Sequence, residues 1–352
     1  MLSNTPTIIF IFETLLVALV ISLLAATFSL WFARRVQLID RPGSAPHKRH
    51  EKPVPMAGGI ALLVTLLVGG MIFDILSFPI IRASFISVLP IFVFGLWDDF
   101  KNLPVVVKLM GQVAAAVLLI YNGVYIQIFE SPEFFFHGTG GVYLYLDWLL
   151  TVLWVVGITN AFNFVDSMDG LAIGLGGTAA AFFMLVTLGS QQLSLSQHSA
   201  LIFGACIGLY FFNSPPAVLF LGDSGAQTLG FLLSVLAIGY APLGANQSSS
   251  WFVPIMLLSV PIFDASLVIF SRLRRGKPIY AASLDHTYHR LLKLGLSSNR
   301  AVLVMQMAAL TLGCLAFISL NQPPLIANLI FSLVLLLGGI LIIFLDRKAS
   351  PV

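Results

Sequence analysis

The sequence predicts an all-α polytopic membrane protein with about 10–11 transmembrane helices. Of its 352 residues, 58% are hydrophobic and only 9% are charged, whereas about a quarter of the residues in a soluble domain carry a charge. Apolar runs long enough to span a bilayer also recur along the chain. These observations exclude a soluble cytosolic enzyme, a secreted binding module and a disordered protein. They predict one membrane-embedded domain over residues 1–352.

Transmembrane helices are expected wherever an apolar run approaches the length of about 20 residues that a helical span needs. No basic residues precede the first run and Arg34-Arg35 follows it, so we expect an uncleaved helix and not a signal peptide. Within residues 122–146, hydrophobic and aromatic residues alternate around glycines, which predicts a small external β-hairpin. The expected helices cover residues 8–32, 57–77, 82–98, 105–121, 147–163, 170–190, 199–213, 225–244, 251–271, 300–320 and 325–345.

The basic residues gather in a few regions between these helices. Because cytoplasmic loops carry an excess of Lys and Arg, we place all of these regions inside the cell. The order of the helices then puts the N-terminus outside and the C-terminus in the cytoplasm. Arg82 is the one basic residue outside the regions, which are residues 34–52, 101–108, 272–300 and 347–348.

Two adjacent acids, Asp98 and Asp99, close the apolar segment 82–98. Neighbouring carboxylates disfavour each other's ionisation, and negative charge at a helix C-terminus opposes the helix dipole. A solvated loop start is the alternative interpretation, but an unfavourable arrangement of this kind favours a functional site. Since consecutive helical residues point about 100° apart, one acid can face a substrate while protein groups hold the other.

A polar residue recurs at every third position where the segment 147–163 ends. On a helix, this spacing forms a polar stripe that drifts slowly around the axis. A hydrogen-bonded seam between helices is the alternative, but such a seam does not require acids. We therefore expect the stripe to line a site for a polar ligand or a metal ion. Its members are Asn160, Asn163, Asp166 and Asp169.

A glycine-rich motif, Gly222-Asp223-Ser224-Gly225, introduces the segment 225–244. Asp223 or Ser224 can cap this helix, which is the simple structural interpretation. Free backbone N–H groups at such a helix start also attract phosphate, and a carboxylate there can hold Mg²⁺. The motif by itself does not decide between the two interpretations.

Two basic loops complete the polar regions. The loop 272–300 contains His286, His289 and Arg290. Its positive charge can be a topology signal or a surface for anionic lipid, but cations opposite acids on one membrane face also suit a diphosphate clamp. H-x-x-H spacing can hold zinc, yet no further Cys or His is placed to complete that shell. The other loop contains His47 and Lys48, and its Pro and Gly content predicts a fixed shape beside the site.

Taken together, these motifs resemble those of the polyprenyl-phosphate N-acetylhexosamine-1-phosphate transferases. The resemblance extends from Asp40 to Arg300. One departure is Tyr288, since relatives often read H-x-H-H where this chain reads His286-Thr287-Tyr288-His289. The matching elements, in the family's order, are H-K-R-H with P-x-P-x-x-G-G, W-D-D, N-A-F-N-F-V-D-S-M-D-G, L-G-D-S-G and the histidine-bearing basic loop.

The resemblance implies a Mg²⁺-dependent enzyme of the bacterial cytoplasmic membrane, with Mn²⁺ as a substitute ion and the active site facing the cytoplasm. Its substrates would be a UDP-N-acetylhexosamine, with UDP-GlcNAc favoured, and undecaprenyl phosphate. The reaction would release UMP and begin the membrane stage of a cell-envelope polysaccharide pathway. The lipid bilayer would surround the protein, no nucleic acid would bind it, and a homodimer is an assembly that occurs in the family.

The resemblance also implies roles for individual residues. The Mg²⁺ ligands would be Asn163 and Asp223. The catalytic acids would be Asp98, Asp99 and Asp166, the first two acting on the lipid phosphate. The substrate-binding residues would be Lys108 at the diphosphate, Asp169 near the uridine, Asn160, His286, His289, Arg290, His47 and Lys48.

Alternative functions remain open from the sequence. Transfer of phospho-MurNAc-pentapeptide in peptidoglycan synthesis uses related motifs, although the motif order favours the UDP-GlcNAc branch. A membrane transporter would place its acids near mid-span, whereas here they lie at helix ends. A CDP-alcohol phosphotransferase would share Asp166-x-x-Asp169-Gly170, but the Ala-Arg pair expected after two more residues is Ile173-Gly174 in this chain.

Overall fold

The computed structural model describes residues 5–42, 52–131, 136–138, 140–241, 251–278 and 285–348. These residues are overwhelmingly helical. The first half of the chain contains α1 (Thr5–Arg35), α2 (Gly58–Ile72), the short 3₁₀ helix η2 (Ile75–Ser77), α3 (Pro79–Lys101), α4 (Val105–Tyr121), α5 (Gly141–Val165) and α6 (Leu171–Gly189). The second half contains α7 (Leu193–Asn213), α8 (Gly222–Gly239), α10 (Phe252–Leu257), α11 (Ser259–Arg274), α12 (Thr287–Lys293), α13 (Ser298–Ser319) and α14 (Pro324–Lys348).

Within the described residues, every expected apolar segment overlaps one or more of these helices, and residues 242–244 of the segment 225–244 lie outside the described residues. Within the described residues, seven helices are long and apolar enough to cross a membrane, and α2 and α4 are shorter apolar helices. The prediction of an all-α polytopic membrane protein is confirmed. The seven are α1, α3, α5, α6, α7, α13 and α14.

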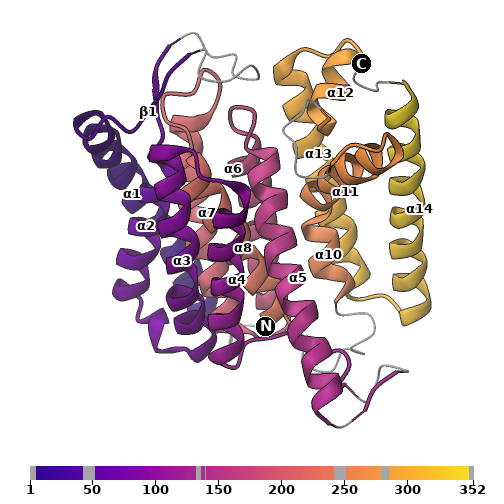
Figure 1. The fold of residues 1–352 in the computed structure, drawn as a ribbon. Coiled ribbons are helices and arrows are strands. Elements are labelled where there is room, and N and C mark those ends of the chain that lie inside the picture. The colour runs from indigo at the N-terminus through magenta and orange to yellow at the C-terminus, as the bar shows by residue number, and fades with distance from the viewer. Residues whose placement is uncertain are drawn as a thin grey trace.

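The helices form one bundle in which α1 and α14 lie on opposite sides and α8 lies between them (Figure 1). α8 contacts α2, α3, α5 and α6, and most of its side chains are buried. α14 packs against α11 and α13 at its ends, while apolar side chains such as Leu325 and Leu337 are mostly exposed. An outer surface of this kind suits contact with hydrocarbon and not with water.

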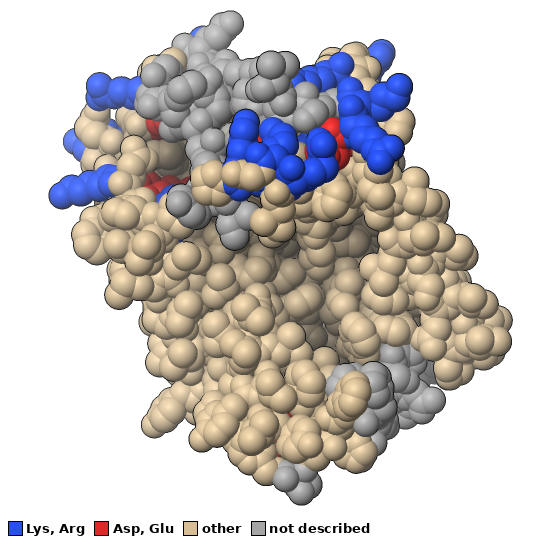
Figure 2. Space-filling view, turned by 45° about the vertical axis from the view of Figure 1, so that its right-hand side comes forward, with Lys and Arg blue, Asp and Glu red and all other residues tan. Residues whose placement is uncertain are grey.

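Basic side chains gather at one end of the molecule, and most of the remaining visible surface is uncharged (Figure 2). We call this the basic end. It carries the last turns of several helices, whose basic residues are Arg34 and Arg35 of α1, Lys101 of α3, Arg272 and Arg274 of α11, and Arg347 and Lys348 of α14. One positively charged face is the distribution expected of a membrane protein with a cytoplasmic side.

The expected external β-hairpin does not form, because residues 142–145 belong to the first turns of α5. Residues 124–126 are not in a strand. Instead, the backbone N–H groups of Ile128 and Phe129 donate to the buried carboxylate of Asp147, at 2.9 and 3.0 Å. Alternation over four residues does not distinguish a strand from a helix, and the apolar run that follows extends the helix back through this stretch.

The expected segment 251–271 is broken into α10 and α11 at Leu258. Pro261 explains the position of the break, because a proline has no N–H to donate to the carbonyl four residues earlier, here that of Leu257. α11 consequently runs in a different direction from α10 (Figure 1). This change of direction carries the C-terminal end of α11 to the basic end, where it meets α12 and α14.

Candidate active site

α3 and α8 approach each other closely at the basic end, where the W-D-D and L-G-D-S-G motifs meet. A Cβ atom on Gly95 would lie 2.6 Å from the Cα atom of Ser224, so a side chain there would separate the helices. Gly222 has a φ of +73°, and a Cβ atom there would lie 2.7 Å from a carboxylate oxygen of Asp99. Glycine avoids both problems, and the two glycines bring Asp99 against the first turn of α8.

Asp99 fills the N-terminus of α8. Its carboxylate accepts hydrogen bonds from the backbone N–H groups of Asp223 at 2.7 Å and Ser224 at 3.2 Å, and from the Ser224 hydroxyl at 2.6 Å. Both the free N–H groups and the helix dipole favour a carboxylate in this position. These N–H groups are therefore not free for a phosphate, which corrects that expectation for the glycine-rich motif. Of the paired acids, Asp99 is the one that protein groups hold.

Asp98 faces the ammonium group of Lys108 on α4. Lys108 Nζ lies 2.6 Å from Asp98 Oδ2 and 2.6 Å from Asp223 Oδ2, so a single cation bridges carboxylates from α3 and α8. The Lys108 and Asp223 side chains are both 26% exposed, whereas Asp98 is nearly buried. Lys108 and Asp223 are therefore partly accessible to a ligand, whereas Asp98 is mostly covered.

Amide side chains extend this cluster toward α5. Asn163 hydrogen-bonds to Asp223, so the two predicted metal ligands lie together. Gln227 donates to Asp223 Oδ2 at 3.2 Å. Gln112 donates to Gln227 Oε1 at 3.0 Å and accepts a hydrogen bond from Asn160 at 2.6 Å. The sequence reasoning missed both glutamines, although a glutamine within an apolar helix is itself a signal, because it needs polar partners there.

Asp166 and Asp169 add further carboxyls where α5 ends. Burial, and after it the negative charges of three neighbouring acids, raise the pKa of the Asp166 carboxyl well above its usual range. Those acids are Asp223, Asp99 and Asp169. Asp169 accepts a hydrogen bond from the backbone N–H of Ala217 at 3.0 Å. Carboxyls crowded in this way are stabilised by a nearby cation.

The histidine motif lies beside α5, at the start of α12. The ring centroids of His286 and Phe164 are 5.6 Å apart, and Phe164 is next to Asn163 and two residues from Asp166 in the sequence. The Tyr288 hydroxyl and His289 Nε2 are 2.6 Å apart. The structure therefore places the two histidines together and near the stripe on α5, with the unusual tyrosine bonded to one of them.

Asp264 of α11 is a residue that the sequence reasoning missed. Its carboxylate is 1% exposed; one oxygen lies 2.8 Å from His286 Nδ1 and the other accepts the Thr287 N–H at 2.6 Å. An acid within the apolar segment 251–271 was the available signal, because a carboxylate in such a segment is costly unless it is paired.

Arg290 is directed away from the acidic cluster, into the packing between α11, α12 and α14. It is fully buried, and its guanidinium donates to the Asp285 carbonyl at 3.0 Å and to the Ser271 hydroxyl at 2.6 Å. It also donates to the Leu345 carbonyl at 3.1 Å and lies 3.4 Å from Asp346 Oδ1. These contacts correct the expectation that Arg290 binds substrate directly, because they use the guanidinium to fasten α12 to its neighbours.

His47 and Lys48 lie outside the described residues, so their place beside the site stays a prediction. The loop that follows them is fastened to the L-G-D-S-G motif. The two-residue strands β1 (Ile39–Asp40) and β2 (Val54–Pro55) pair with each other, and the Phe220 N–H donates to the Pro55 carbonyl at 2.9 Å.

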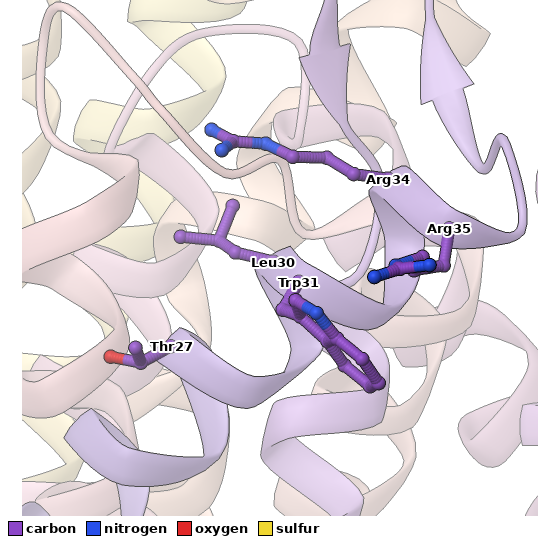
Figure 3. A pocket seen from close by; sticks show the side chains of 5 residues that line it. All are labelled: Thr27, Leu30, Trp31, Arg34 and Arg35. Atoms are coloured by element: carbon purple, nitrogen blue, oxygen red, sulfur yellow. The ribbon is translucent and has the colours of Figure 1, made fainter.

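A cavity of about 530 Å³ lies along the last two turns of α1 (Figure 3). Its lining consists of Thr27, Leu30, Trp31, Arg34 and Arg35, and the Arg35 guanidinium lies 5.6 Å from the centre of the Trp31 ring. Tryptophan with arginine at a helix end is typical of a membrane interface. α1 contributes none of the clustered acids, so this cavity is not part of the candidate active site.

The acidic cluster has the donor chemistry of a magnesium site. Within the described ranges, no three His, Cys, Asp or Glu side chains converge as a ready-made cage for a metal ion. Mg²⁺, however, is commonly held by one or two carboxylates, while substrate phosphates and waters complete its shell. Asp98 and Asp223, which share one ammonium, offer two carboxylates of this kind, and the Asn163 amide lies beside them. The residues present therefore fit the ion.

Comparison with known proteins identifies the family. The family model described as "Glycosyl transferase family 4" matches residues 81–241, the part of the chain that carries the acidic cluster. A probable undecaprenyl-phosphate N-acetylglucosaminyl 1-phosphate transferase of Bacillus subtilis is 32% identical over 301 residues, which cover 83% of this chain and 81% of that protein. The chain belongs to the polyprenyl-phosphate N-acetylhexosamine-1-phosphate transferase family.

Two further relatives of this transferase have names that specify the same kind of reaction. A decaprenyl-phosphate N-acetylglucosaminephosphotransferase of Mycobacterium tuberculosis is 30% identical over 80% of this chain and 76% of that protein. An undecaprenyl-phosphate alpha-N-acetylglucosaminyl 1-phosphate transferase of Escherichia coli is 27% identical over 90% of this chain and 88% of that protein. The family inferred from the order of the motifs is therefore confirmed.

Proposed function

We propose that the protein transfers an N-acetylhexosamine 1-phosphate from a UDP-sugar to undecaprenyl phosphate and releases UMP. GlcNAc-1-phosphate is the group favoured, because the names of the relatives from Bacillus subtilis and Escherichia coli specify N-acetylglucosaminyl 1-phosphate transfer to undecaprenyl phosphate. The single observation that carries the proposal is the bridged pair of carboxylates, Asp98 and Asp223, held by Lys108 at the basic end.

The position of the cluster suits a reaction between a lipid and a water-soluble nucleotide. The acids lie where α3 and α5 end and α8 begins, at the end of the bundle that carries the basic helix termini (Figure 2). A lipid phosphate can reach this level from the bilayer, and a nucleotide can reach it from water. The positive charge at the same end supports an active site at the cytoplasmic face of a bacterial cytoplasmic membrane.

The proposed chemistry is a direct displacement at phosphorus. An oxygen of the lipid phosphate forms a bond to the β-phosphorus of the UDP-sugar. At the same time the bond from that phosphorus to the oxygen bridging to the α-phosphate breaks, and this oxygen leaves as part of UMP. The second pKa of a phosphomonoester is about 6, so the nucleophile is largely dianionic at neutral pH and does not require a strong base.

The described residues of the cluster have separate roles in binding the substrates and the metal ion. The Lys108 ammonium moves from the two carboxylates to the diphosphate of the donor and neutralises its negative charge. Asp98 orients the incoming lipid phosphate. Asp223, Asp98 and Asn163 would hold Mg²⁺, which when bound supplies charge neutralisation on the phosphoryl oxygens. Asp99 keeps the first turn of α8 in place, so that Asp223 is presented at the right position.

Release of UMP by the purified protein tests the proposal. With Mg²⁺ and undecaprenyl phosphate, we expect UMP from UDP-GlcNAc and much less from UDP-GalNAc or UDP-MurNAc-pentapeptide. Preference for UDP-MurNAc-pentapeptide would assign the protein to peptidoglycan synthesis instead. No UMP from any of the three would contradict the proposed transfer, and a solute flux in vesicles without UDP-sugar would indicate a transporter.

The direct displacement has its own test. Incubation with UDP-GlcNAc labelled in the β-phosphate, without undecaprenyl phosphate, should leave the protein unlabelled. A phosphorylated Asp98 or Asp99 recovered from that incubation would show a two-step route through the enzyme.

A further inference from the structure

We propose that Asp264 is a positioning residue for the transfer, because it fixes the His286 imidazole beside the acidic cluster, where that ring binds the phosphates of the nucleotide-sugar donor. The inference rests on the proposed function, and it adds a residue from α11 to a site otherwise built from α3, α4, α5 and α8.

Both oxygens of the Asp264 carboxylate are committed to the start of α12. Asp264 Oδ2 lies 2.8 Å from His286 Nδ1, and Asp264 Oδ1 accepts the Thr287 N–H at 2.6 Å. A carboxylate is an acceptor only, so the hydrogen between the two groups is on Nδ1 of the imidazole. The second ring nitrogen, Nε2, is therefore the one left for a ligand, which is how a carboxylate usually directs a functional histidine.

The ring is also confined from the side of α5. The ring centroids of His286 and Phe164 are 5.6 Å apart, and the His286 side chain is only 13% exposed. Phe164 lies in the last turn of α5, next to Asn163 and two residues before Asp166. The imidazole is thus held between α11 and α5, at the point where the polar stripe on α5 faces the histidine motif.

The pairing of charges distinguishes Asp264 from the other buried acids of this region. Asp285 and Asp346 each lie within ion-pair distance of more than one arginine. For Asp264, the ion-pair partner within the described residues is a histidine, His286, and not an arginine. A buried carboxylate is costly without a partner, so a purely structural role would be better served by an arginine or by an apolar side chain. The choice of a histidine, whose ring lies beside Phe164 of α5, points to a role in binding.

The rest of α12 is anchored independently of this pair. The Arg290 guanidinium donates to the Asp285 carbonyl and to the Ser271 hydroxyl, and it contacts Asp346. α12 therefore stays in place when the contact between Asp264 and His286 is weakened. A substitution at Asp264 is expected to loosen the imidazole and not the helix.

The experiment compares Asp264→Asn, His286→Gln and the double variant in the UMP-release assay. We expect Asp264→Asn to raise the KM for UDP-GlcNAc by about tenfold, the factor equivalent to one charge-assisted hydrogen bond. The KM for undecaprenyl phosphate and kcat should change by less than about threefold. If Asp264 acts through His286, adding Asp264→Asn to His286→Gln should cause no further increase in the donor KM.

Asp147→Asn is the matched control. Asp147 is also a fully buried acid that accepts backbone N–H groups, but it lies at the opposite end of α5. The substitution Asp147→Asn should lower thermal stability in detergent and leave the KM for UDP-GlcNAc unchanged.

An inactive wild-type protein would contradict the proposed function itself. With an active wild type, an unchanged donor KM in Asp264→Asn would overturn the role of Asp264. The role of Asp264 would also be overturned if the increases in the donor KM from the two single substitutions multiplied in the double variant. Such a result would show that Asp264 and His286 contribute independently.

Discussion

Replacing Asp99 with asparagine separates the roles of the paired acids. Asp99 accepts three hydrogen bonds from the first turn of α8. An asparagine keeps one carbonyl oxygen for the Asp223 N–H, but its amide group then faces the N–H of Ser224. A backbone N–H left without an acceptor in a buried position costs about 1–3 kcal/mol. We therefore expect Asp99→Asn to lower the free energy of unfolding by about 1–3 kcal/mol.

Asp98→Asn is the matched variant at the neighbouring position. The asparagine oxygen can still accept the Leu103 N–H, and Lys108 retains its contact with Asp223. Because Lys108 is partly exposed, losing its other ion pair should change stability by less than about 1 kcal/mol. Activity should nevertheless fall by at least about 100-fold, since in the proposed mechanism Asp98 orients the lipid phosphate.

Both variants are measured for thermal unfolding in detergent and for UMP release at saturating substrates. The structure predicts a destabilised Asp99→Asn, and a stable but inactive Asp98→Asn. The opposite order of stabilities would refute the assignment of Asp99 as the anchor of α8. Equal stabilities with equal loss of activity would refute the division between the two acids.

The remaining predictions concern the metal ligand, the glycine turn and the buried arginine. Asp223→Asn should lower turnover by at least about 100-fold and leave the protein folded; ordinary activity with Mg²⁺ would remove Asp223 from the metal shell. Gly222→Ala should lower the free energy of unfolding by about 1–3 kcal/mol, from its positive φ and from its contact with Asp99; an unchanged melting temperature would contradict this. Arg290→Met should cost about 3–5 kcal/mol, because it leaves Asp346 buried with less compensation, and a small melting-temperature shift would show that Arg290 is not an anchor.

The transmembrane helices could be predicted from the sequence because their signal is compositional. In a bilayer every backbone polar group has to be satisfied within the helix, so a long apolar run leaves little choice of structure. The break at Leu258 and the start of α5 were missed for a different reason. The break depends on a proline, and the start of α5 depends on how a four-residue alternation is interpreted. Hydropathy averaged over a long segment does not show either of these local features.

The candidate site could be predicted only as a set of motifs. The sequence places Asp98 and Asp99 side by side, but it does not say which of them faces α8, because that depends on how α3 is rotated in the bundle. From the sequence alone, Arg290 cannot be distinguished from the exposed basic residues of the same loop. Its burial follows from partners that come from three other segments, and no local pattern records them.

Asp264 was not predicted as a site residue, although the structure places it against His286. It is a single acid in an apolar run, without a neighbouring polar motif, and its partner His286 lies 22 residues further along the chain. The break between α10 and α11 turns α11 toward α12 and makes this contact. An isolated acid in an apolar segment therefore indicates a partner elsewhere in the chain, here the histidine at the start of α12.

Mass spectrometry of the lipid extract, after incubation with UDP-GlcNAc, undecaprenyl phosphate and Mg²⁺, tests the proposed transfer directly. We expect a diphosphate-linked N-acetylhexosamine on undecaprenol, formed by the wild type in amounts equal to the UMP released and absent with Asp223→Asn. UMP without this lipid, or the lipid formed equally well by Asp223→Asn, would contradict it.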